Sequence, residues 1–327
     1  MKILVIRFSS IGDIVLTTPI IRCLKQQTNA EIHFITKKAF EPILKDNPFI
    51  DKLITIKSSI KEVKEELKLE QYDEIIDLHK NLRTKALKRY LGVSAHSFDK
   101  LNIKKWLLVK FKRDLMPDIH IVDRYFETVK HMGVKSDNQP SDFFIDANNN
   151  VDINQTFGIE GSFVAIAIGA QFATKRLPFE KLIEVIAQIN APIILAGGAT
   201  DEELANQIIV HFKRPTIYNA CGGFNLQQSA SIVSQANVLM TNDTGLMHIA
   251  ACYKTPIVSV WGNTVPQLGM YPYLPQNKEL YSIHEVKGLN CRPCSKIGFK
   301  ECPKGHFNCM MKQNSVEIVE KIQEKLN

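Results

Sequence analysis

The sequence predicts an α/β protein made of two doubly wound domains. Short apolar runs of strand length alternate along the chain with longer segments of helical apolar spacing. Such alternation is typical of parallel sheets whose two faces are covered by helices. A polar segment rich in Asn and Asp interrupts the series once, at residues 136–161. The 327 residues are enough for two domains that each bury a core.

The first half of the chain predicts one parallel sheet with its connecting helices. Lys2–Phe8 is expected to be a buried strand, and Ile14–Gln27 a helix that continues through Pro19. The elements expected next are strands at 31–36, 52–56 and 74–78 and helices at 60–69, 82–91 and 119–132. Ligands of such sheets bind beyond the carboxyl ends of the strands. Asp13 and His79 fall at such ends.

The second half predicts another series of the same kind. Its expected strands are 163–168, 192–195, 216–218, 238–240 and 257–260, and its expected helices are 178–189, 201–212, 226–235, 246–253 and 316–326. We place the domain boundary in the polar segment between the two series. The predicted domains are therefore residues 1–155 and residues 156–327.

Composition and charge limit the class of protein. The chain is 45% hydrophobic and 23% charged, as in ordinary globular proteins. It contains no apolar run long enough to cross a bilayer. Arg7 and Asp13 follow the apolar segment Ile3–Ile6 so closely that a signal peptide is not expected. We therefore expect a cytoplasmic protein whose seven cysteines are mostly reduced. The net charge of +7 favours anionic partners, but no nucleic-acid recognition motif is present.

Residues 100–113 form a basic segment, KLNIKKWLLVKFKR, in which apolar side chains are interleaved with lysines. A helix of this composition can lie on a membrane surface. An ordinary amphipathic helix with a solvated basic face explains the pattern equally well.

The segment from Ala236 to Gly262 predicts a strand, a polar loop, a short helix and a second strand. Asp243 and Thr244 stand at the helix start, where oxygen side chains cap free N–H groups. The same N–H groups and the helix dipole can bind a phosphate. Gly245 lets a ligand approach the backbone, and His248 lies one turn further on. From spacing alone we favour a capped helix with a satisfied core histidine.

Three stretches of the chain resemble the family 9 glycosyltransferases, the ADP-heptose:lipopolysaccharide heptosyltransferases and their relatives. They are KILVIRFSSIGDIVLTTPIIRCLK near the start, NDTGLMHIAA followed by a strand that ends in VWG, and CRPCSKIGFKECPKGHFNCM near the end. Two doubly wound domains without a GxGxxG motif also resemble the GT-B architecture, in which the domains face each other across a cleft. The resemblance implies that the last helix packs back on the N-terminal domain.

The resemblance implies an inverting transferase that moves a heptose from ADP-heptose onto a lipopolysaccharide or lipooligosaccharide core. Such an enzyme would contact an anionic glycolipid acceptor and associate peripherally with the cytoplasmic face of the inner membrane. One alternative is a transferase of the same family that uses another nucleotide sugar. A second is a sugar-nucleotide-binding protein without catalysis, against which the presence of Asp13 argues.

Asp13 occupies the position at which the family carries its catalytic aspartate. A carboxylate in a loop above a parallel sheet can act as general base, although it can equally cap a helix. Gly12 lets a sugar approach this loop, and Ser10 contributes a hydrogen bond. In relatives, basic residues of the N-terminal domain contact acidic or phosphorylated sugars. The matching candidates here, which also fit ordinary surface charges, are Lys80, Arg83 and Arg124.

The resemblance places the donor in the C-terminal domain. Lys175, in the loop GAQFATKRLP at 169–178, matches the family's phosphate-binding lysine, with Arg176 as a possible substitute and Thr174 as a hydroxyl partner. Glu202 matches the ribose contact, although an acidic first turn also suits any helix. The remaining expected donor contacts are Asp243, Thr244, Gly245 and His248. The chain has no DxD motif in a suitable loop, so we expect no metal and no cofactor to be required.

Four cysteines near the end of the chain, Cys291, Cys294, Cys302 and Cys309, include one CxxC pair. Four such ligands can hold zinc in a tetrahedral site. The spacing between the pairs is unusual for a zinc finger. We therefore favour reduced thiols that pack an irregular loop over a structural zinc site.

Overall fold

The computed structural model describes residues 1–326, which divide into two compact units. The N-terminal unit contains Met1–Lys100 and Ile119–Phe144, and the C-terminal unit contains Leu101–Asp118 and the chain from Ile145 onward. From Leu101 on, the basic segment thus groups with the C-terminal unit. We predicted the domain boundary after residue 155, whereas in this division the chain passes to the second unit after Phe144.

The N-terminal unit is built on a five-stranded parallel sheet in the order β3-β2-β1-β4-β5. Its strands are β1 (Lys2–Ile6), β2 (Glu31–Lys37), β3 (Lys52–Ile56), β4 (Glu74–Asp77) and β5 (Ser94–Ser97). The central strand β1 reads KILVI and is buried from its second residue on, because both faces of a parallel sheet are covered. The strand order reverses between β1 and β4, which makes this pair the topological switch point of the sheet.

Short helices cover this sheet. They are α1 (Ile11–Val15), α2 (Thr18–Thr28), α3 (Lys64–Leu69), α4 (Leu82–Leu91) and α6 (Ile121–Phe126), with the 3-10 turns η1 (Lys38–Ile43), η2 (Ile60–Glu62) and η3 (Lys130–Met132). Leu67 of α3 and Leu87 of α4 pack in one buried cluster with Leu4 of β1. Helices α2 and α6 pack against each other.

The C-terminal unit contains a six-stranded parallel sheet in the order β11-β10-β9-β6-β7-β8. Its strands are β6 (Val164–Ala167), β7 (Ile193–Ala196), β8 (Ile217–Asn219), β9 (Val238–Asn242), β10 (Ile257–Trp261) and β11 (Tyr281–Glu285). Here the order reverses between β6 and β9. Each of the two units therefore has a single switch point at its centre.

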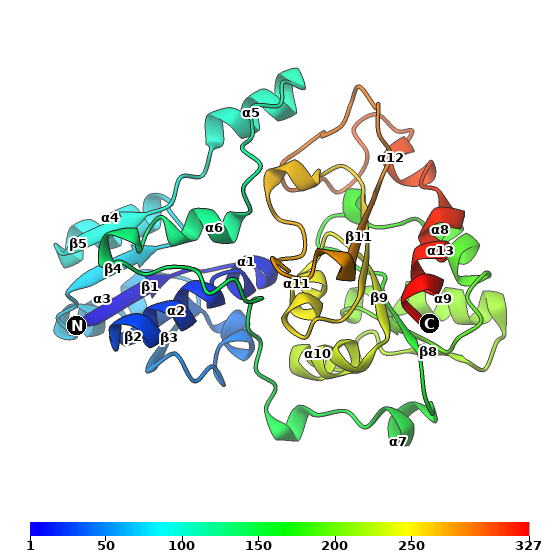
Figure 1. Ribbon diagram of the computed structural model, residues 1–327, viewed down its shortest axis with the longest axis horizontal. Helices are drawn as coiled ribbons and strands as arrows, with labels where there is room; N and C mark the ends of the chain where they lie inside the picture. The colour runs from blue at the N-terminus through cyan, green and yellow to red at the C-terminus, as the bar shows by residue number, and fades with distance from the viewer. Residues whose placement is uncertain (327) are drawn as a thin grey trace. The chain divides into compact units, whose positions relative to one another are not determined.

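Helices cover both faces of this second sheet (Figure 1). Helices α8 (Phe179–Ile186), α9 (Glu202–Phe212) and α13 (Ser315–Leu326) lie on one side, and α10 (Leu226–Gln235) and α11 (Gly245–Cys252) lie on the other. The unit is completed by α5 (Asn102–Phe111), α7 (Ile153–Phe157), α12 (Asn308–Met311), η4 (Ala147–Asn149), η5 (Ala173–Lys175), η6 (Ala199–Asp201), η7 (Pro266–Leu268) and η8 (Lys278–Leu280). None of the helices within residues 1–326 combines the length and the apolar character that a membrane span needs.

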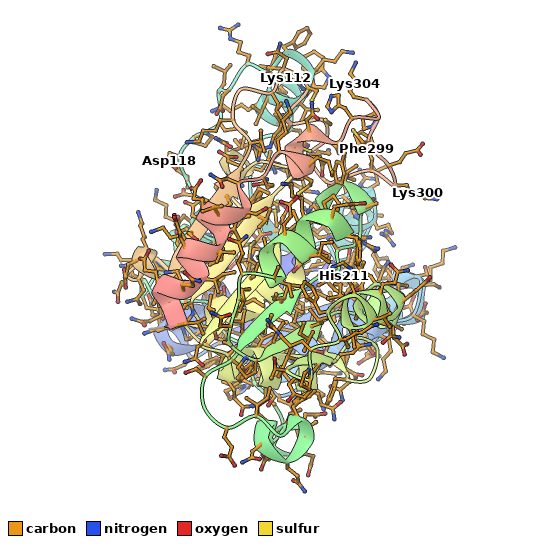
Figure 2. The ribbon with its side chains drawn as sticks, turned by 90° about the vertical axis from the view of Figure 1, so that its right-hand side faces the viewer. Lys112, Asp118, His211, Phe299, Lys300 and Lys304 are labelled. Carbon is orange, nitrogen blue, oxygen red and sulfur yellow. The ribbon has the colours of Figure 1, made fainter. Side chains whose placement is uncertain are left out.

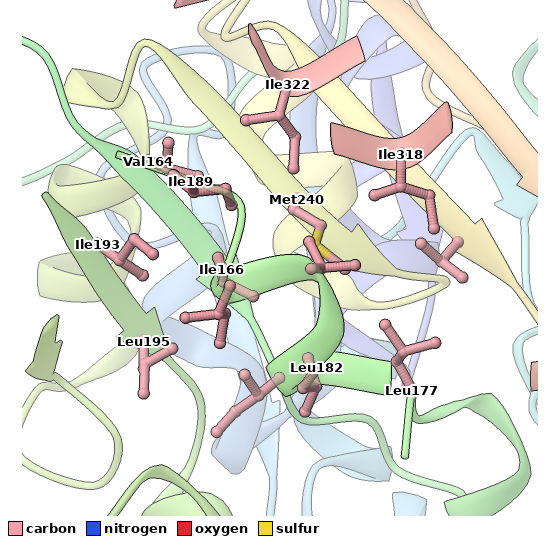
Figure 3. Packing of buried hydrophobic residues seen from close by; sticks show 14 of the residues in the cluster. Val164, Ile166, Leu177, Leu182, Ile189, Ile193, Leu195, Met240, Ile318 and Ile322 are labelled. Carbon is pink, nitrogen blue, oxygen red and sulfur yellow. The ribbon is translucent and has the colours of Figure 1, made fainter. Parts of the chain in front are cut away.

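The last helix, α13, belongs to the core of the C-terminal unit (Figure 3). Its Ile318 and Ile322 are fully buried in one cluster with Leu182 of α8 and Met240 of β9. This corrects the expectation that the helix packs back on the N-terminal domain. The apolar spacing of the helix predicted a buried stripe, but the sheet that covers a stripe is chosen by tertiary packing and not by the helix itself.

Other differences from the predicted elements have local causes. The helix expected from Ile14 to Gln27 is two helices, because Pro19 lacks an N–H and occupies the first turn of α2. Strands β5 and β11 were not predicted from their sequences, SAHS and YSIHE. Both lie at an edge of their sheet, where polar residues are tolerated because one flank of the strand has no neighbour.

The placement of α13 predicts a cost for shortening its buried side chains. Ile322→Ala should lower the free energy of unfolding by about 2–5 kcal/mol, since it leaves a cavity in a packed core. Val316→Ala, at a position on the same helix that is 55% exposed, should change it by less than about 0.5 kcal/mol. Urea unfolding of both variants measures the difference, and equally small effects would contradict this packing.

Candidate functional site

In the N-terminal unit, charged side chains gather at the carboxyl ends of β1 and β4. The chain leaves β1 through Arg7–Ser10 and enters α1, and it leaves β4 through Leu78–Asn81 and enters α4. Because the two strands are parallel neighbours, both loops lie at one edge of the sheet. Ligands of doubly wound sheets bind at this position.

Arg7 links the two loops. Its guanidinium is buried and donates from Nε to the Ser9 carbonyl at 2.8 Å, and from Nη1 to the Leu78 carbonyl at 2.5 Å and to the Tyr125 hydroxyl at 3.1 Å. Its Nη2 lies 2.5 Å from Oδ1 of Asp13. A buried charge is tolerated only when it is paired and hydrogen-bonded. Arg7 therefore fixes the position of the Asp13 carboxylate.

Asp13 lies in the first turn of α1 with its side chain 22% exposed. Its Oδ2 accepts a hydrogen bond from the Ser10 hydroxyl at 2.7 Å and one from the Ser10 N–H at 3.2 Å. The carboxylate thus satisfies the helix start, as the capping interpretation expects, and it remains accessible to a substrate. Ser10 holds this carboxylate, while Gly12 is buried within the helix.

His79, Phe8 and Arg83 form the adjoining part of this edge. The His79 ring meets the Phe8 ring edge-on with 5.0 Å between centroids, and the Arg83 guanidinium lies 5.7 Å over the same ring. Burial, helped by the nearby positive charge of Arg7, lowers the pKa of His79 to about 4. The imidazole is therefore neutral at pH 7.

The other two predicted acceptor residues lie differently. Lys80 is exposed, and its Nζ donates to the Phe98 carbonyl at 2.9 Å. Arg124 is only 6% exposed, and burial lowers the pKa of its guanidinium. This burial corrects the interpretation of Arg124 as an ordinary surface charge.

In the C-terminal unit, the loops that follow β6 and β9 meet at the switch point. Lys175 comes from the first loop, and its Nζ lies 2.5 Å from Oδ2 of Asp243, which follows β9. The Thr264 hydroxyl, after β10, donates to the same Oδ2 at 2.9 Å. Three loops that are distant in sequence are thus joined at one carboxylate, beside the start of α11.

The start of α11 lacks a capping hydrogen bond from the side chain at its N-cap position. Thr244 occupies this position with an extended backbone, and its hydroxyl lies 3.2 Å from the hydroxyl of Thr241. By contrast, the side chain of Asn81 caps α4. Helix starts carry backbone N–H groups without helical partners. Gly245 is the first residue of α11, so it places no side chain of its own over these N–H groups.

Asn242 connects these loops through the hydrogen bonds of its side chain. It is buried, its Oδ1 accepts from the Leu177 N–H at 3.1 Å, and its Nδ2 lies 3.3 to 3.4 Å from the carbonyls of residues 167–169. Our sequence analysis assigned Asn242 no role. The available signal was an amide side chain at the end of an otherwise apolar strand.

Thr174 and the cysteine-bearing segment, residues 291–310, hold the Lys175 loop in position. The buried Thr174 hydroxyl accepts from the Phe299 N–H at 2.8 Å and donates to the Phe299 carbonyl at 3.2 Å. Arg292 donates to the carbonyls of Gly262 at 2.6 Å and Thr264 at 2.9 Å. The segment thus holds two loops of the site, and the predicted contact between Thr174 and a donor stays a prediction.

Three further predicted donor residues occupy distinct environments. Glu202 begins α9 and faces an open hollow of about 520 Å³ whose other lining residues are Ala199, Glu203, Asn206, Gln207 and Val210. Arg176, considered as a substitute for Lys175, lies 3.6 Å from Asp201. His248 is buried within α11, as the core-histidine interpretation expects.

Two cysteines of the segment, Cys294 and Cys309, favour the thiol form. Burial raises the pKa of Cys294 to about 11 and that of Cys309 to about 12. The Cys294 thiol donates to the Cys291 carbonyl at 3.0 Å. Within residues 1–326, no three ligand atoms of this segment lie within 4.8 Å of one another. The four cysteines therefore do not converge on one point within the described residues.

Glu74, His96 and His131 bring three metal-ligating side chains together elsewhere in the N-terminal unit. The two imidazole rings stack at 3.8 Å, and each Nε2 faces Oε1 of Glu74, at 3.0 Å from His96 and 2.5 Å from His131. Both nitrogens therefore approach the same carboxylate oxygen. The distances allow ion pairs, but Oε1 of Glu74 is buried and has no hydrogen-bond partner among the described residues.

Comparison with known proteins identifies a family and a fold. The family model of glycosyltransferase family 9 (heptosyltransferase) matches residues 60–300. The chain is similar to lipooligosaccharide heptosyltransferase 2 of Haemophilus influenzae, with 24% identity over 100% of this chain and 99% of the relative. It is also similar to lipopolysaccharide heptosyltransferase 2 of Escherichia coli, with 24% identity over 81% and 84% of the two chains.

Solved structures agree with the predicted fold. A family 9 glycosyl transferase from Veillonella parvula matches with a TM-score of 0.79 and 21% identity, over 99% of this chain and 97% of that one. The E. coli heptosyltransferase WaaC with ADP matches with a TM-score of 0.69 and 20% identity, over 99% and 100% of the two chains. These likenesses confirm the predicted GT-B fold.

The contacts of Asn242 predict a structural role for this side chain. Asn242→Ala should lower the free energy of unfolding by about 1–3 kcal/mol, because buried backbone groups of two loops lose their hydrogen-bond partner. Asn154→Ala is the control, since the exposed side chain of Asn154 meets Glu160 at a distance of 3.5 Å. This variant should change the value by less than about 0.5 kcal/mol. Equal denaturant midpoints for the two variants would rule out this role.

Proposed function

The chain belongs to glycosyltransferase family 9, and we propose that it transfers a heptose from ADP-heptose to a lipopolysaccharide or lipooligosaccharide core, with inversion at the anomeric carbon. The relatives named above support the heptose and the acceptor class. A structure of E. coli WaaC with ADP-2-deoxy-2-fluoro heptose supports the donor. The observation that carries the proposal is Asp13, an accessible carboxylate held by a buried arginine at a switch point.

Asp13 acts as general base in this proposal. The acceptor hydroxyl attacks the anomeric carbon and gives its proton to the Asp13 carboxylate, so that the new glycosidic bond forms as the proton leaves. Arg7 and Ser10 keep the carboxylate in place through the contacts described above. The acceptor is anionic, and Arg83 suits its phosphate or carboxylate groups through paired hydrogen bonds. Lys80 and Arg124 add positive charge on the same unit.

The donor diphosphate binds at the start of α11 beside Lys175. As the bond between the anomeric carbon and the diphosphate breaks, ADP takes the electron pair and its negative charge grows. Lys175 and the N–H groups of the helix start stabilise that charge. Asp243 positions Lys175, and Gly245 leaves the backbone open to the diphosphate. Thr244 adds a hydroxyl at the same helix start.

The remaining proposed donor residues bind the ribose or support the diphosphate site. Glu202 binds the ribose hydroxyls at the hollow that it lines. His248 and Thr174 support the site from buried positions and contribute less to binding than Lys175. Because the acceptor carries lipid, we place the enzyme at the cytoplasmic face of the inner membrane, with no nucleic-acid partner.

The donor assignment is tested by ADP release in the presence of a core acceptor. Release is expected from ADP-heptose and not from UDP-, GDP- or dTDP-sugars. It should persist in EDTA, because a lysine and a helix start stabilise the leaving group without a divalent ion. Turnover from another nucleotide sugar alone would overturn the donor, and activity that EDTA removes and Mg²⁺ restores would overturn the metal-free chemistry.

Asp13→Asn tests the general base. The amide keeps the shape of the side chain but cannot accept the proton, so kcat should fall by roughly 10²-fold or more. Donor affinity should be unchanged, because the proposed donor residues belong to the other unit. Ser10→Ala is the comparison variant and should lower kcat much less, since it only loosens the carboxylate. Thermal unfolding checks that both variants fold, and near-normal turnover of the folded Asn variant would remove Asp13 from the mechanism.

A further inference from the structure

Helix α5 exposes large apolar side chains. Ile103, Trp106 and Phe111 are 76%, 56% and 59% exposed, and the Trp106 and Phe111 rings contact each other at 5.1 Å. Leu108 is the one residue of this helix that is buried, and it packs with Val265 and Leu268. A helix of ten residues is marginal without packing. Exposed apolar side chains grouped in this way are typical of a surface that a partner covers.

Positive charge surrounds these apolar side chains. Residues 104–113 contain Lys104, Lys105, Lys110, Lys112 and Arg113 and no acidic residue. The nearest acidic side chains that follow are Asp114 and Asp118. The helix therefore presents apolar and cationic groups together, which is the composition of helices that lie in a membrane interface.

A second segment of the same unit extends this surface. Lys112 donates from Nζ to the Pro293 carbonyl at 2.7 Å, which joins the end of α5 to the cysteine-bearing segment. Ile297 and Phe299 of that segment are exposed. The segment also exposes Lys296, Lys300 and Lys304, together with one acidic residue, Glu301. Figure 2 shows Lys112, Phe299 and Lys304 toward the same end of the C-terminal unit.

We propose that α5 and the cysteine-bearing segment form a membrane-docking surface that binds anionic phospholipid. The surface consists of the exposed apolar side chains Ile103, Trp106, Phe111, Ile297 and Phe299 and of the lysines around them. The apolar side chains enter the interface between headgroups and acyl chains, while the lysines pair with phosphate. This inference rests on the proposed function, because a lipid-linked acceptor has to be reached at a bilayer. It adds the surface that makes the contact and the charge of the lipid.

Charge complementarity indicates that the partner is an anionic membrane. Each Lys or Arg near an anionic membrane surface strengthens binding by roughly five-fold, and this gain falls as salt screens the charges. Nucleic-acid binding would use the same cations but would leave the aliphatic Ile103 and Ile297 without a function. The membrane accounts for both kinds of side chain, so it is the occupant that the surface fits.

Tryptophan fluorescence with lipid vesicles tests the proposal on the full chain. The protein has two tryptophans, and Trp261 is buried while Trp106 is exposed. Vesicles of phosphatidylcholine with phosphatidylglycerol should sediment the protein and shift its emission to the blue, because Trp106 enters an apolar layer. Phosphatidylcholine vesicles should do neither, and high salt should weaken the binding. Trp106→Phe should still sediment without the shift.

Two variants locate the surface. Lys104→Gln/Lys110→Gln removes two exposed charges of α5 and should weaken vesicle binding by roughly 25-fold, from five-fold per charge. Trp106→Ser/Phe111→Ser should weaken it as well. The matched control is Val210→Ser/Lys213→Gln on α9, which removes one exposed apolar side chain and one lysine elsewhere on the same unit and should bind normally.

These experiments distinguish a failure of the docking surface from a failure of the proposed reaction. The docking surface would be contradicted if the wild-type protein did not bind anionic vesicles. It would also be contradicted if the α5 variants bound these vesicles as tightly as the control variant does. Both α5 variants should keep normal ADP release with a lipid-free core oligosaccharide. Absence of transfer by wild-type protein that still docks through α5 would refute the reaction and leave the surface standing.

Discussion

The topological switch point of each parallel sheet is the constraint on which the candidate site of each unit depends. Strand order reverses between β1 and β4 in the N-terminal unit and between β6 and β9 in the C-terminal unit. At these positions the loops of two neighbouring strands turn to opposite faces of the sheet and leave room between them. Asp13 follows β1 and His79 follows β4, while Lys175 follows β6 and Asp243 follows β9. The residues that we propose to carry the chemistry are thus placed by strand order before any side chain is considered.

Buried or partly buried ion pairs then fix the side chains within these loops. A charge taken out of water is costly unless a partner compensates for it. Arg7 meets this requirement with Asp13 and three oxygen acceptors, and Lys175 meets it with Asp243. In the chain without ligand, Asp243 thus serves as the counter-ion of Lys175, and an arriving diphosphate would share that cation. The Lys175 site is thus organised in advance, as the proposed stabilisation of a leaving group requires.

Local sequence predicted the parts of this arrangement that depend on neighbouring residues. The alternation of apolar runs predicted the α/β class. The motifs that resemble the family predicted the loops that carry Asp13, Lys175 and Asp243. The partners of Arg7 are 71 and 118 residues away, at Leu78 and Tyr125, so its role follows only from the fold. The same holds for α13, because its apolar stripe could be covered by either sheet.

The central claim is that the Lys175 cation, held by Asp243, binds the diphosphate of the donor. Isothermal titration of ADP against wild-type protein and Lys175→Met measures this directly, with Lys181→Met as control because Lys181 pairs with Glu184 on α8. A hydrogen bond to a charged group contributes about 1.5–3 kcal/mol, so we expect the Lys175 variant to bind ADP at least about ten-fold more weakly. The control should bind as wild type does. Equal affinity of the Lys175 variant and the control would contradict the account.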